Sequence, residues 1–218
     1  MKRILCLCIC MMAMAAPHAV ALEAEPEESI VVINEVMINP DAVSDSRGEW
    51  IELYNSSSNP VSLLGWTVTD GKRDMFIIDE DIVIPPDGYV VLARCSDPLR
   101  NGGVHVDFEY SGMYLANGGD AILIFDKMGA VQDALFYSEE RGFTIPCGAS
   151  HEVKDPFKTN TPSSQWAPST SVFGDGDLGT PGTCNSWYVP PNPVQRPPRG
   201  ALFFLFKKGI LPVDGFLE

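Results

Sequence analysis

The decisive stretch of this 218-residue sequence is GEWIELYN, residues Gly48 to Asn55, which is followed by GWTVTD at Gly65 to Asp70. Both segments are short and rich in aromatic and β-branched residues, which is typical of β-strands. The first contains two carboxylates, Glu49 and Glu52. Side chains of a regular strand alternate between two faces, so these glutamates point to opposite sides of the sheet. Two acids on opposite sides cannot flank one bond, which excludes paired acid catalysis at a regular strand here.

The same alternation sorts the remaining side chains of this strand. Ile51 and Leu53 are the expected core-facing pair. Trp50, Glu52 and Tyr54 then share the outward face, where the carboxylate stays solvated and the two rings either cover the sheet or form an aromatic platform for a ligand. We therefore take these three residues as the candidate binding site.

Nine short segments of this strand-like type follow one another, each closed by turn residues. They are Ile30–Ile38, Glu49–Asn55, Val61–Thr69, Met75–Ile78, Ile82–Ile84, Tyr89–Arg94, Ala121–Phe125, Val131–Tyr137 and about Ala149–Val153. No window of useful length has the 3.6-residue period of a helix. Short strands at this spacing predict an all-β fold, an antiparallel β-sandwich with one core over residues 30–185.

Turn residues separate these strands at defined places. Pro85-Pro86-Asp87-Gly88 predicts a turn between two apolar runs, and Asp126-Lys127-Met128-Gly129 predicts a hairpin connection. Trp66, which follows Gly65, is expected to anchor the core.

The first 21 residues have the pattern of a cleaved export signal. Lys2 and Arg3 precede an apolar run at residues 4–16, and Ala19-Val20-Ala21 offers a small-x-small cleavage site. The run is shorter than the ~20 residues that a membrane-spanning helix needs. We expect a secreted, periplasmic or cell-surface protein with no transmembrane segment in the mature chain, in which residues 22–29 form an acidic flexible lead.

The mature chain is strongly acidic. Loss of Lys2 and Arg3 lowers the 15 Lys and Arg residues to 13, against 29 Asp and Glu, which gives a net charge of −16. Nucleic-acid binding depends on clustered Lys and Arg that release counterions from phosphates. The charge therefore argues against a nucleic-acid partner, whereas it is compatible with divalent cations.

Three cysteines remain after cleavage, Cys95, Cys147 and Cys184. In an exported chain one disulfide and one odd thiol are expected. The pairing stays open on sequence, and we favour Cys147–Cys184. No C-x-x-C spacing accompanies the cysteines, which argues against a zinc site.

The composition changes after Asn185. Residues 186–200 contain five prolines and predict an extended spacer, and residues 201–218 end the chain with a short apolar tail. Its apolar core, Ala201–Phe206, is too short to cross a bilayer. Its role stays open between a tail without a partner, docking to a partner or membrane surface, and a sorting element.

Six segments in this order resemble the lamin-tail domain family as found in exported bacterial proteins. They are VVINEVMINP (Val31–Pro40), GEWIELYN, PVSLLGWTVTD (Pro60–Asp70), IPPDGYVVLAR (Ile84–Arg94), LANGGDAILIFD (Leu115–Asp126) and GDLGTPGTCN (Gly176–Asn185). The resemblance spans roughly residues 30–185 and implies an immunoglobulin-like β-sandwich. Bacterial domains of this kind are usually non-catalytic, and some accompany nucleases or phosphatases, whereas this chain carries no recognisable enzyme domain.

The resemblance and the residues lead to one main hypothesis and two alternatives. The main hypothesis is an exported, non-catalytic module that binds or scaffolds a protein or cell-envelope component. The first alternative is an accessory factor of a separate exported nuclease or other hydrolase. The second is a calcium-stabilised adhesion domain; no other cofactor is expected.

Three carboxylates are the candidates for a metal. Asp175 and Asp177 echo the opening of a calcium loop, but Ser186 stands where an EF-hand needs a bidentate glutamate, so a standard EF-hand is excluded. The alternative is a structural turn at Thr180-Pro181-Gly182. Glu35 lies among apolar residues near the start of the first strand, where a buried carboxylate needs hydrogen-bond donors, so structural bonding is favoured over metal binding.

Nucleophilic catalysis has little support in the sequence. Only His105 and His151 survive cleavage, and no G-x-S-x-G elbow, phosphate-binding loop or dinucleotide fingerprint is present. Each histidine is expected at the surface or at a strand edge, and we expect no enzymatic activity.

Overall fold

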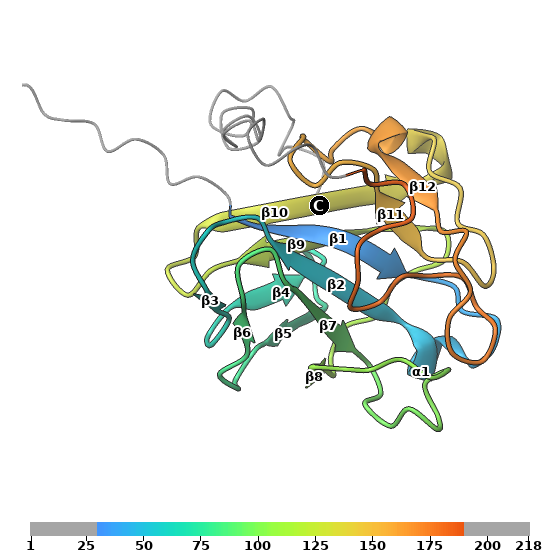
Figure 1. Cartoon of the computed structure of the whole chain (residues 1–218), viewed down its shortest axis with the longest axis horizontal. Helices are drawn as coiled ribbons and strands as arrows, with labels where there is room; N and C mark the ends of the chain where they lie inside the picture. Colours follow the sequence, from blue (N-terminus) through green and yellow to red (C-terminus); the bar gives the residue numbers. More distant parts are fainter. Residues whose placement is uncertain (1–29, 190–218) are drawn as a thin grey trace, which may run out of the picture.

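The strand that carries Glu35 lies near the middle of the larger of two main sheets (Figure 1). The computed structural model describes residues 30–189. The larger sheet has six strands in the order β12-β11-β1-β2-β7-β8. Their bounds are β1 Val31–Met37, β2 Trp50–Asn55, β7 Tyr89–Ala93, β8 Phe108–Glu109, β11 His151–Val153 and β12 Trp166–Pro168.

The second main sheet has four strands in the order β10-β9-β4-β5, and a small pair, β3-β6, lies beside it. Their bounds are β3 Val61–Ser62, β4 Thr67–Thr69, β5 Met75–Ile77, β6 Val83–Ile84, β9 Gly119–Phe125 and β10 Val131–Ser138. All paired strands are antiparallel except β7 and β8. The helical elements of the described part are one turn of α-helix and two 3-10 turns, α1 Asp45–Gly48, η1 Glu139–Arg141 and η2 Ser163–Gln165. The chain is thus an immunoglobulin-like antiparallel β-sandwich, as the sequence predicted.

The nine predicted strands are present, with one correction and two omissions. Val61–Thr69 is not one strand: it divides into β3 and β4 at a turn that the Trp66 N–H closes on the Leu63 carbonyl, with Gly65 at φ 82°. A side chain at that φ is strained, which is why glycine interrupts the strand. The omitted strands, β8 and β12, are two- and three-residue edge strands, too short for a period to be visible.

Both predicted connections between strands are confirmed. The Gly88 N–H donates to the Pro85 carbonyl, and the Gly129 N–H donates to the Asp126 carbonyl at 2.9 Å in each case. Asp126 also accepts N–H bonds from Met128 and Ala130 through its carboxylate, which is the local bonding that favours aspartate in turns.

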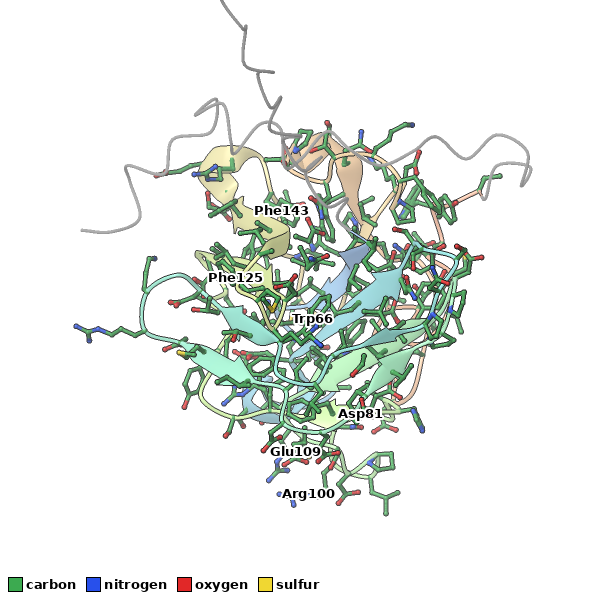
Figure 2. All side chains as sticks on the ribbon, turned by 90° about the vertical axis from the view of Figure 1, so that its left-hand side faces the viewer. Trp66, Asp81, Arg100, Glu109, Phe125 and Phe143 are labelled. Atoms are coloured by element: carbon green, nitrogen blue, oxygen red, sulfur yellow. The ribbon has the colours of Figure 1, made fainter. Side chains whose placement is uncertain are left out.

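The core lies between the two main sheets. Ile51 and Leu53 are fully buried in it, and Trp66, which is 4% exposed, packs in the same cluster (Figure 2). The predicted inward residues of β2 and the predicted tryptophan anchor are therefore confirmed.

A β-bulge ties the two sheets together along β1. The register of β1 against β2 shifts between Ile33 and Glu35, so that Asn34 is an extra residue in the strand. β11 pairs with β1 only at Glu35 and Val36, and the Ile33 N–H instead donates to the Asp133 carboxylate of β10 at 2.8 Å. β10 therefore lies along β1, as Figure 1 shows, and closes one side of the sandwich.

Several sequence predictions lie outside the described residues: the export signal at 1–21, the acidic lead at 22–29, and the spacer and tail after residue 189. Within residues 30–189, no helix is both long and apolar enough to cross a membrane.

The core assignment predicts a large loss of stability from Leu53→Ala. Removing a fully buried leucine side chain between close-packed sheets is expected to lower the free energy of unfolding by about 2–5 kcal/mol. Chemical denaturation measures this. Leu99→Ala is the matched control because Leu99 is 91% exposed, and it is expected to change stability by less than about 0.5 kcal/mol. Equal effects of the two substitutions would contradict the assigned core.

Candidate functional site

Three glutamates lie side by side on the outer face of the six-stranded sheet. The bulge at Asn34 sets Glu35 of β1 opposite Glu52 of β2, and on its other side Glu35 pairs with Glu152 of β11. All three residues are fully buried. We call Glu152, Glu35 and Glu52 the glutamate row.

The segment Thr180–Ser186 crosses over the glutamate row and supplies it with hydrogen-bond donors. The Thr180 N–H donates to Glu35 at 2.8 Å, and the Gly182 N–H donates to Glu52 at 2.5 Å. The Ser186 N–H donates to Glu152 at 2.6 Å. Each carboxylate thus accepts one backbone N–H from the same segment, and the three donors are spaced two and four residues apart.

Hydroxyl groups complete the bonding of the row. Ser150 donates to Glu35 at 2.5 Å, Thr180 lies 2.7 Å from Glu35, and Ser186 lies 3.0 Å from Glu152. A buried carboxylate without such partners would be strongly destabilising. The predicted structural bonding of Glu35 is therefore confirmed.

Two asparagine amides fix the segment at the bulge. Asn34 donates to Glu52 at 2.7 Å and to the Asn185 side chain at 2.6 Å. Asn185 donates in return to the Asn34 carbonyl at 3.0 Å and to the Val153 carbonyl at 2.8 Å. Asn34 can reach Asn185 because the extra residue of the bulge places it, like Glu35, on the outer face.

The shape of the segment follows from its sequence. The predicted turn at Thr180-Pro181-Gly182 is confirmed: the Thr183 N–H donates to the Thr180 carbonyl at 3.0 Å, and Gly182 has a φ of 80°. Proline fixes the first turn position and glycine permits the positive φ at the second. The turn aims the Gly182 N–H at the sheet below.

The row holds acidic groups without a counter-charge. Within residues 30–189 the ion pairs are Arg94–Glu49 and Lys158–Asp155, and neither involves the row. Burial raises the pKa of Glu35 to about 7, with hydrogen bonds from Ser150 and Thr180 opposing the shift. Burial, and next the adjacent Glu35 charge, raises the pKa of Glu52 well above its ordinary value. Glu35 and Glu52 therefore retain protons at a pH at which ordinary carboxylates have lost them.

The hydroxyl of Thr180 supports the same conclusion from geometry. It lies 2.7 Å from a Glu35 oxygen and 3.2 Å from a Glu152 oxygen, yet a hydroxyl has one proton to donate. Both contacts are hydrogen bonds if a protonated Glu35 donates to the Thr180 oxygen while Thr180 donates to Glu152. This pair of hydrogen bonds accounts for both contacts of the Thr180 hydroxyl without a cation.

The candidate binding residues of β2 do not form an exposed platform, and the prediction that Glu52 stays solvated is wrong. Trp50 is 1% exposed and Tyr54 is 3% exposed. Phe173 packs on Trp50, with the two ring centroids 6.1 Å apart, and Tyr54 packs against Phe157. The face is outward with respect to the sandwich core, as predicted, but residues that follow β10 in the sequence cover it.

Glu49 lies on the opposite side, as the alternation predicted. Its carboxylate accepts the Leu115 N–H at 3.1 Å and pairs with Arg94 at 3.2 Å. Burial raises its pKa to about 7, and the Leu115 N–H and the Arg94 charge oppose that shift. Glu49 and Glu52 are thus separated by the sheet and serve two different sets of backbone amides.

The three metal candidates do not form one site. Asp177 accepts N–H bonds from Asp41 and Ala42 through its carboxylate, Asp175 is exposed, and Glu35 belongs to the glutamate row. Within residues 30–189 no three His, Cys, Asp or Glu side chains gather in a way that could hold a metal ion. The geometry gives Asp177 a structural role in fastening the turn after β1.

The predicted Cys147–Cys184 disulfide is not formed, and Cys95, Cys147 and Cys184 are free thiols. Cys147 lies beside Asp41 after the end of β1, whereas Cys184 lies in the segment over the glutamate row. The two cysteines thus lie near different parts of β1, and their spacing in the sequence did not reveal this separation.

Neither histidine is placed for catalysis. His151 was expected at the surface or at a strand edge, and that prediction is wrong: it is 3% exposed, in a strand paired on both sides. Its ring centroid lies 4.7 Å from that of Phe143, and burial lowers its pKa to about 4. It alternates with Glu152 along β11 and so faces away from the glutamate row. His105 is exposed, as expected.

Sequence reasoning missed Glu152, Asn34 and Asn185. A signal for the bulge was present, since Asn34 and Glu35 are adjacent polar residues inside the apolar run VVINEVM and break its alternation. Nothing local marked Glu152 as a partner of Glu35. The assembled site can fasten a chain segment to a sheet, and its three carboxylates are buried beneath that segment.

The raised pKa of Glu35 predicts the pH dependence of stability. Between its ordinary value of 4.5 and about 7 the folded state binds more protons at Glu35 than the unfolded state does. Stability from this group is therefore fully present at pH 4.5 and declines as pH rises towards 7, by on the order of 3 kcal/mol. Glu35→Gln cannot titrate, and its amide can donate to Thr180 as a protonated acid does. The unfolding midpoint of Glu35→Gln relative to the native chain should rise from pH 5 to pH 8.

Glu109→Gln is the control for this measurement. Glu109 is exposed, and hydrogen bonds from Ser96 lower its pKa, so it titrates below pH 5. Its midpoint relative to the native chain should stay constant from pH 5 to pH 8. A constant difference for Glu35→Gln as well would contradict the raised pKa of Glu35.

Calcium is expected to leave the thermal midpoint unchanged. The Asp177 carboxylate is already bonded to two backbone amides, and Asp175 alone offers a cation too few oxygens. A bound ion at a hundred times its dissociation constant would add about 2.7 kcal/mol. Thermal melts in calcium and in chelator measure this, with Asp175→Asn as the control. A midpoint that rises with calcium in the native chain only would restore the metal hypothesis.

Comparisons with known proteins relate the chain to a solved structure and to a family model. A solved DUF4876 family protein from Bacteroides thetaiotaomicron is similar at 12% identity over 74% of this chain and 69% of that chain, with a TM-score of 0.42. No curated protein matches. The family model described as Lamin Tail Domain matches residues 24–139, which include strands β1 to β10, whereas β11, β12 and the segment over the glutamate row follow the matched region. The chain belongs to the lamin-tail domain family.

Proposed function

We propose that this protein is an exported, non-catalytic module that binds a protein or another component of the cell envelope. The observation that carries the proposal is the use of its buried acids. The segment Thr180–Ser186 donates hydrogen bonds to Glu35, Glu52 and Glu152. Glu49 accepts the Leu115 N–H and pairs with Arg94. Groups that hold the fold together in this way are not free to hold or activate a substrate. The sequence pattern of residues 1–21 supports export.

Three exposed apolar side chains lie in the segment after β7 or in loops that are joined to it. Leu99 is 91% exposed, Val172 is 72% exposed and Tyr114 is 57% exposed. We call these three residues the loop end. The Asp175 N–H joins the loop of Val172 to that of Leu99 by donating to the Gly102 carbonyl at 3.0 Å.

Tyr114 belongs to this end because Arg94 holds it there. The Arg94 guanidinium lies 4.3 Å from the Tyr114 ring centroid and also pairs with Glu49. A cation over the ring fixes the aromatic group in place while leaving it more than half exposed. An exposed aromatic ring that is already ordered loses little entropy on binding, which favours a contact role.

The charge of the described part limits the kind of partner. Residues 30–189 contain 9 Lys and Arg against 23 Asp and Glu. Such a surface repels phosphate backbones and attracts cationic groups. The proposal is therefore a protein or envelope partner with basic or apolar contact groups. An exported nuclease or hydrolase would be one such partner, which would make the chain its accessory factor.

The double variant Leu99→Ser with Tyr114→Ser tests the loop end. It is expected to lose at least tenfold in the amount of cross-linked partner recovered from the native envelope, because it removes the exposed apolar contacts and leaves the core intact. Met128→Ser is the matched control, since Met128 is 83% exposed in the β9–β10 turn. Equal recovery with the double variant and the native chain would contradict the assigned surface. A hydrolytic activity of the purified chain that Glu35→Gln abolishes would contradict the non-catalytic role.

A further inference from the structure

The four-stranded sheet has an outer face that the described chain leaves open. Val68, Phe76 and Ile124 of this sheet point into the core. The side chains that alternate with them point outward, and the strand register aligns these in two rows of three. One row is Ile77, Thr67 and Phe125, and the other is Met75, Thr69 and Leu123.

These six residues, which we call the apolar face, carry no charge. Ile77 is 53% exposed and Met75 is 48% exposed, and the remaining four are half-buried. The outer face of an antiparallel sheet in water is normally polar. The other main sheet has apolar outward residues too, Trp50 and Tyr54, but a later segment of the same chain covers them. A contiguous apolar surface on a folded domain usually marks a contact.

The rest of the chain contains a segment that matches this face in character. Ala201–Phe206 reads ALFFLF, and it follows a spacer with prolines at 190, 191, 193, 197 and 198. The face is about three residues wide and two rows deep, which six apolar residues can cover. No other continuous apolar stretch of this kind follows the sandwich.

The spacer is long enough to reach. Tyr188 packs with Val32 and Tyr54 on the outside of the six-stranded sheet. That end of β1 lies beside the start of β10, where the Ile30 N–H donates to Gln132 at 3.4 Å. Residues 190–200 span roughly 35 Å if extended like polyproline, whereas packed sheets lie about 10 Å apart. The chain can therefore pass the β10 edge and arrive at the row that contains Phe125.

Charge complements the apolar match. Asp79, Glu80 and Asp81 follow the buried Ile78 at the end of β5 and are exposed (Figure 2 labels Asp81). Lys207 and Lys208 follow Phe206 directly. Residues 190–218 contain four basic and two acidic side chains, whereas residues 30–189 contain 9 basic and 23 acidic side chains. Two lysines thus follow the apolar segment in the sequence, and three carboxylates follow the last strand of the apolar face.

We propose that Ala201–Phe206 docks on the apolar face of the same molecule, with Lys207 and Lys208 against Asp79–Asp81. The docked tail covers the second sheet as Thr180–Ser186 covers the first. The C-terminal part of the chain then dresses both outer faces of the sandwich. The inference does not depend on the proposed function.

Disulfide trapping in the full chain tests the contact. In a background with all six cysteines replaced by serine, Ile77→Cys combined with Phe204→Cys should form a disulfide within one molecule. The matched control is Leu99→Cys combined with Phe204→Cys, since Leu99 is also exposed but belongs to the loop end. Non-reducing electrophoresis and peptide mapping report the product. An internal disulfide at Ile77 and none at Leu99 supports the proposal. Absence of the Ile77 product, equal products at both positions, or a disulfide-linked dimer overturns it, and a dimer identifies a second copy as the occupant.

Two further variants test the chemistry of the contact. Lys207→Glu with Lys208→Glu should slow the trapping severalfold by repulsion from Asp79–Asp81, whereas Arg196→Glu with Arg199→Glu in the spacer should not. A chain that ends at Gly200 should bind severalfold more of a hydrophobic fluorescent dye, and its β5 amides should exchange faster. Unchanged dye binding and exchange in the shortened chain would overturn the proposal.

Discussion

The structure depends on how a row of buried carboxylates is satisfied. Glu152, Glu35 and Glu52 lie next to one another across three strands and are shielded from water. Acids placed so close together repel and are poorly solvated, so each needs donors or a proton. The segment Thr180–Ser186 supplies a backbone N–H to each. The raised pKa values of Glu35 and Glu52 favour the protonated form of these two carboxyl groups. The sheet and the segment are therefore stable only together.

One extra residue in β1 makes this arrangement possible. Without the bulge, Asn34 and Glu35 would point to opposite faces, and one polar side chain would enter the apolar core. With it, Glu35 joins the row and Asn34 pairs with Asn185, while Asp133 takes up the freed Ile33 N–H. The same irregularity thus aligns the acids, anchors the covering segment and closes the sandwich against β10.

The buried acids of this molecule differ in their surroundings from catalytic carboxylates. Catalytic carboxylates with raised pKa values lie in a cleft where substrate can reach them. Here three glutamates with raised pKa values, Glu35, Glu52 and Glu49, are covered and already bonded to backbone amides. For these glutamates, a raised pKa accompanies a structural role in fastening another segment of the chain to the sheet. The surface that we propose for recognition is the loop end.

The alternation of side chains along a strand predicted the features of the fold that depend on neighbouring residues in the chain. It identified the β2 strand, the opposite directions of Glu49 and Glu52, and the Trp66 anchor, because each depends on neighbours in the chain. It could not show that the outer face of β2 is covered, because the covering residue Gly182 follows Glu52 by 130 positions.

The same limit applies to Glu152, whose alignment with Glu35 depends on the pairing of β11 with β1. The Thr180-Pro181-Gly182 turn was visible in the sequence, but not what the turn rests on.

Amide hydrogen exchange of Thr180, Gly182 and Ser186 tests the central claim most directly. These three N–H groups lie in a segment without secondary structure, and they are protected only if they donate to the glutamate row. The account predicts exchange as slow as that of the β1 and β2 amides, with all three amides released together when Glu35 and Glu52 are both replaced by alanine. Exchange of these amides at the rate of an unstructured peptide in the native chain would contradict it.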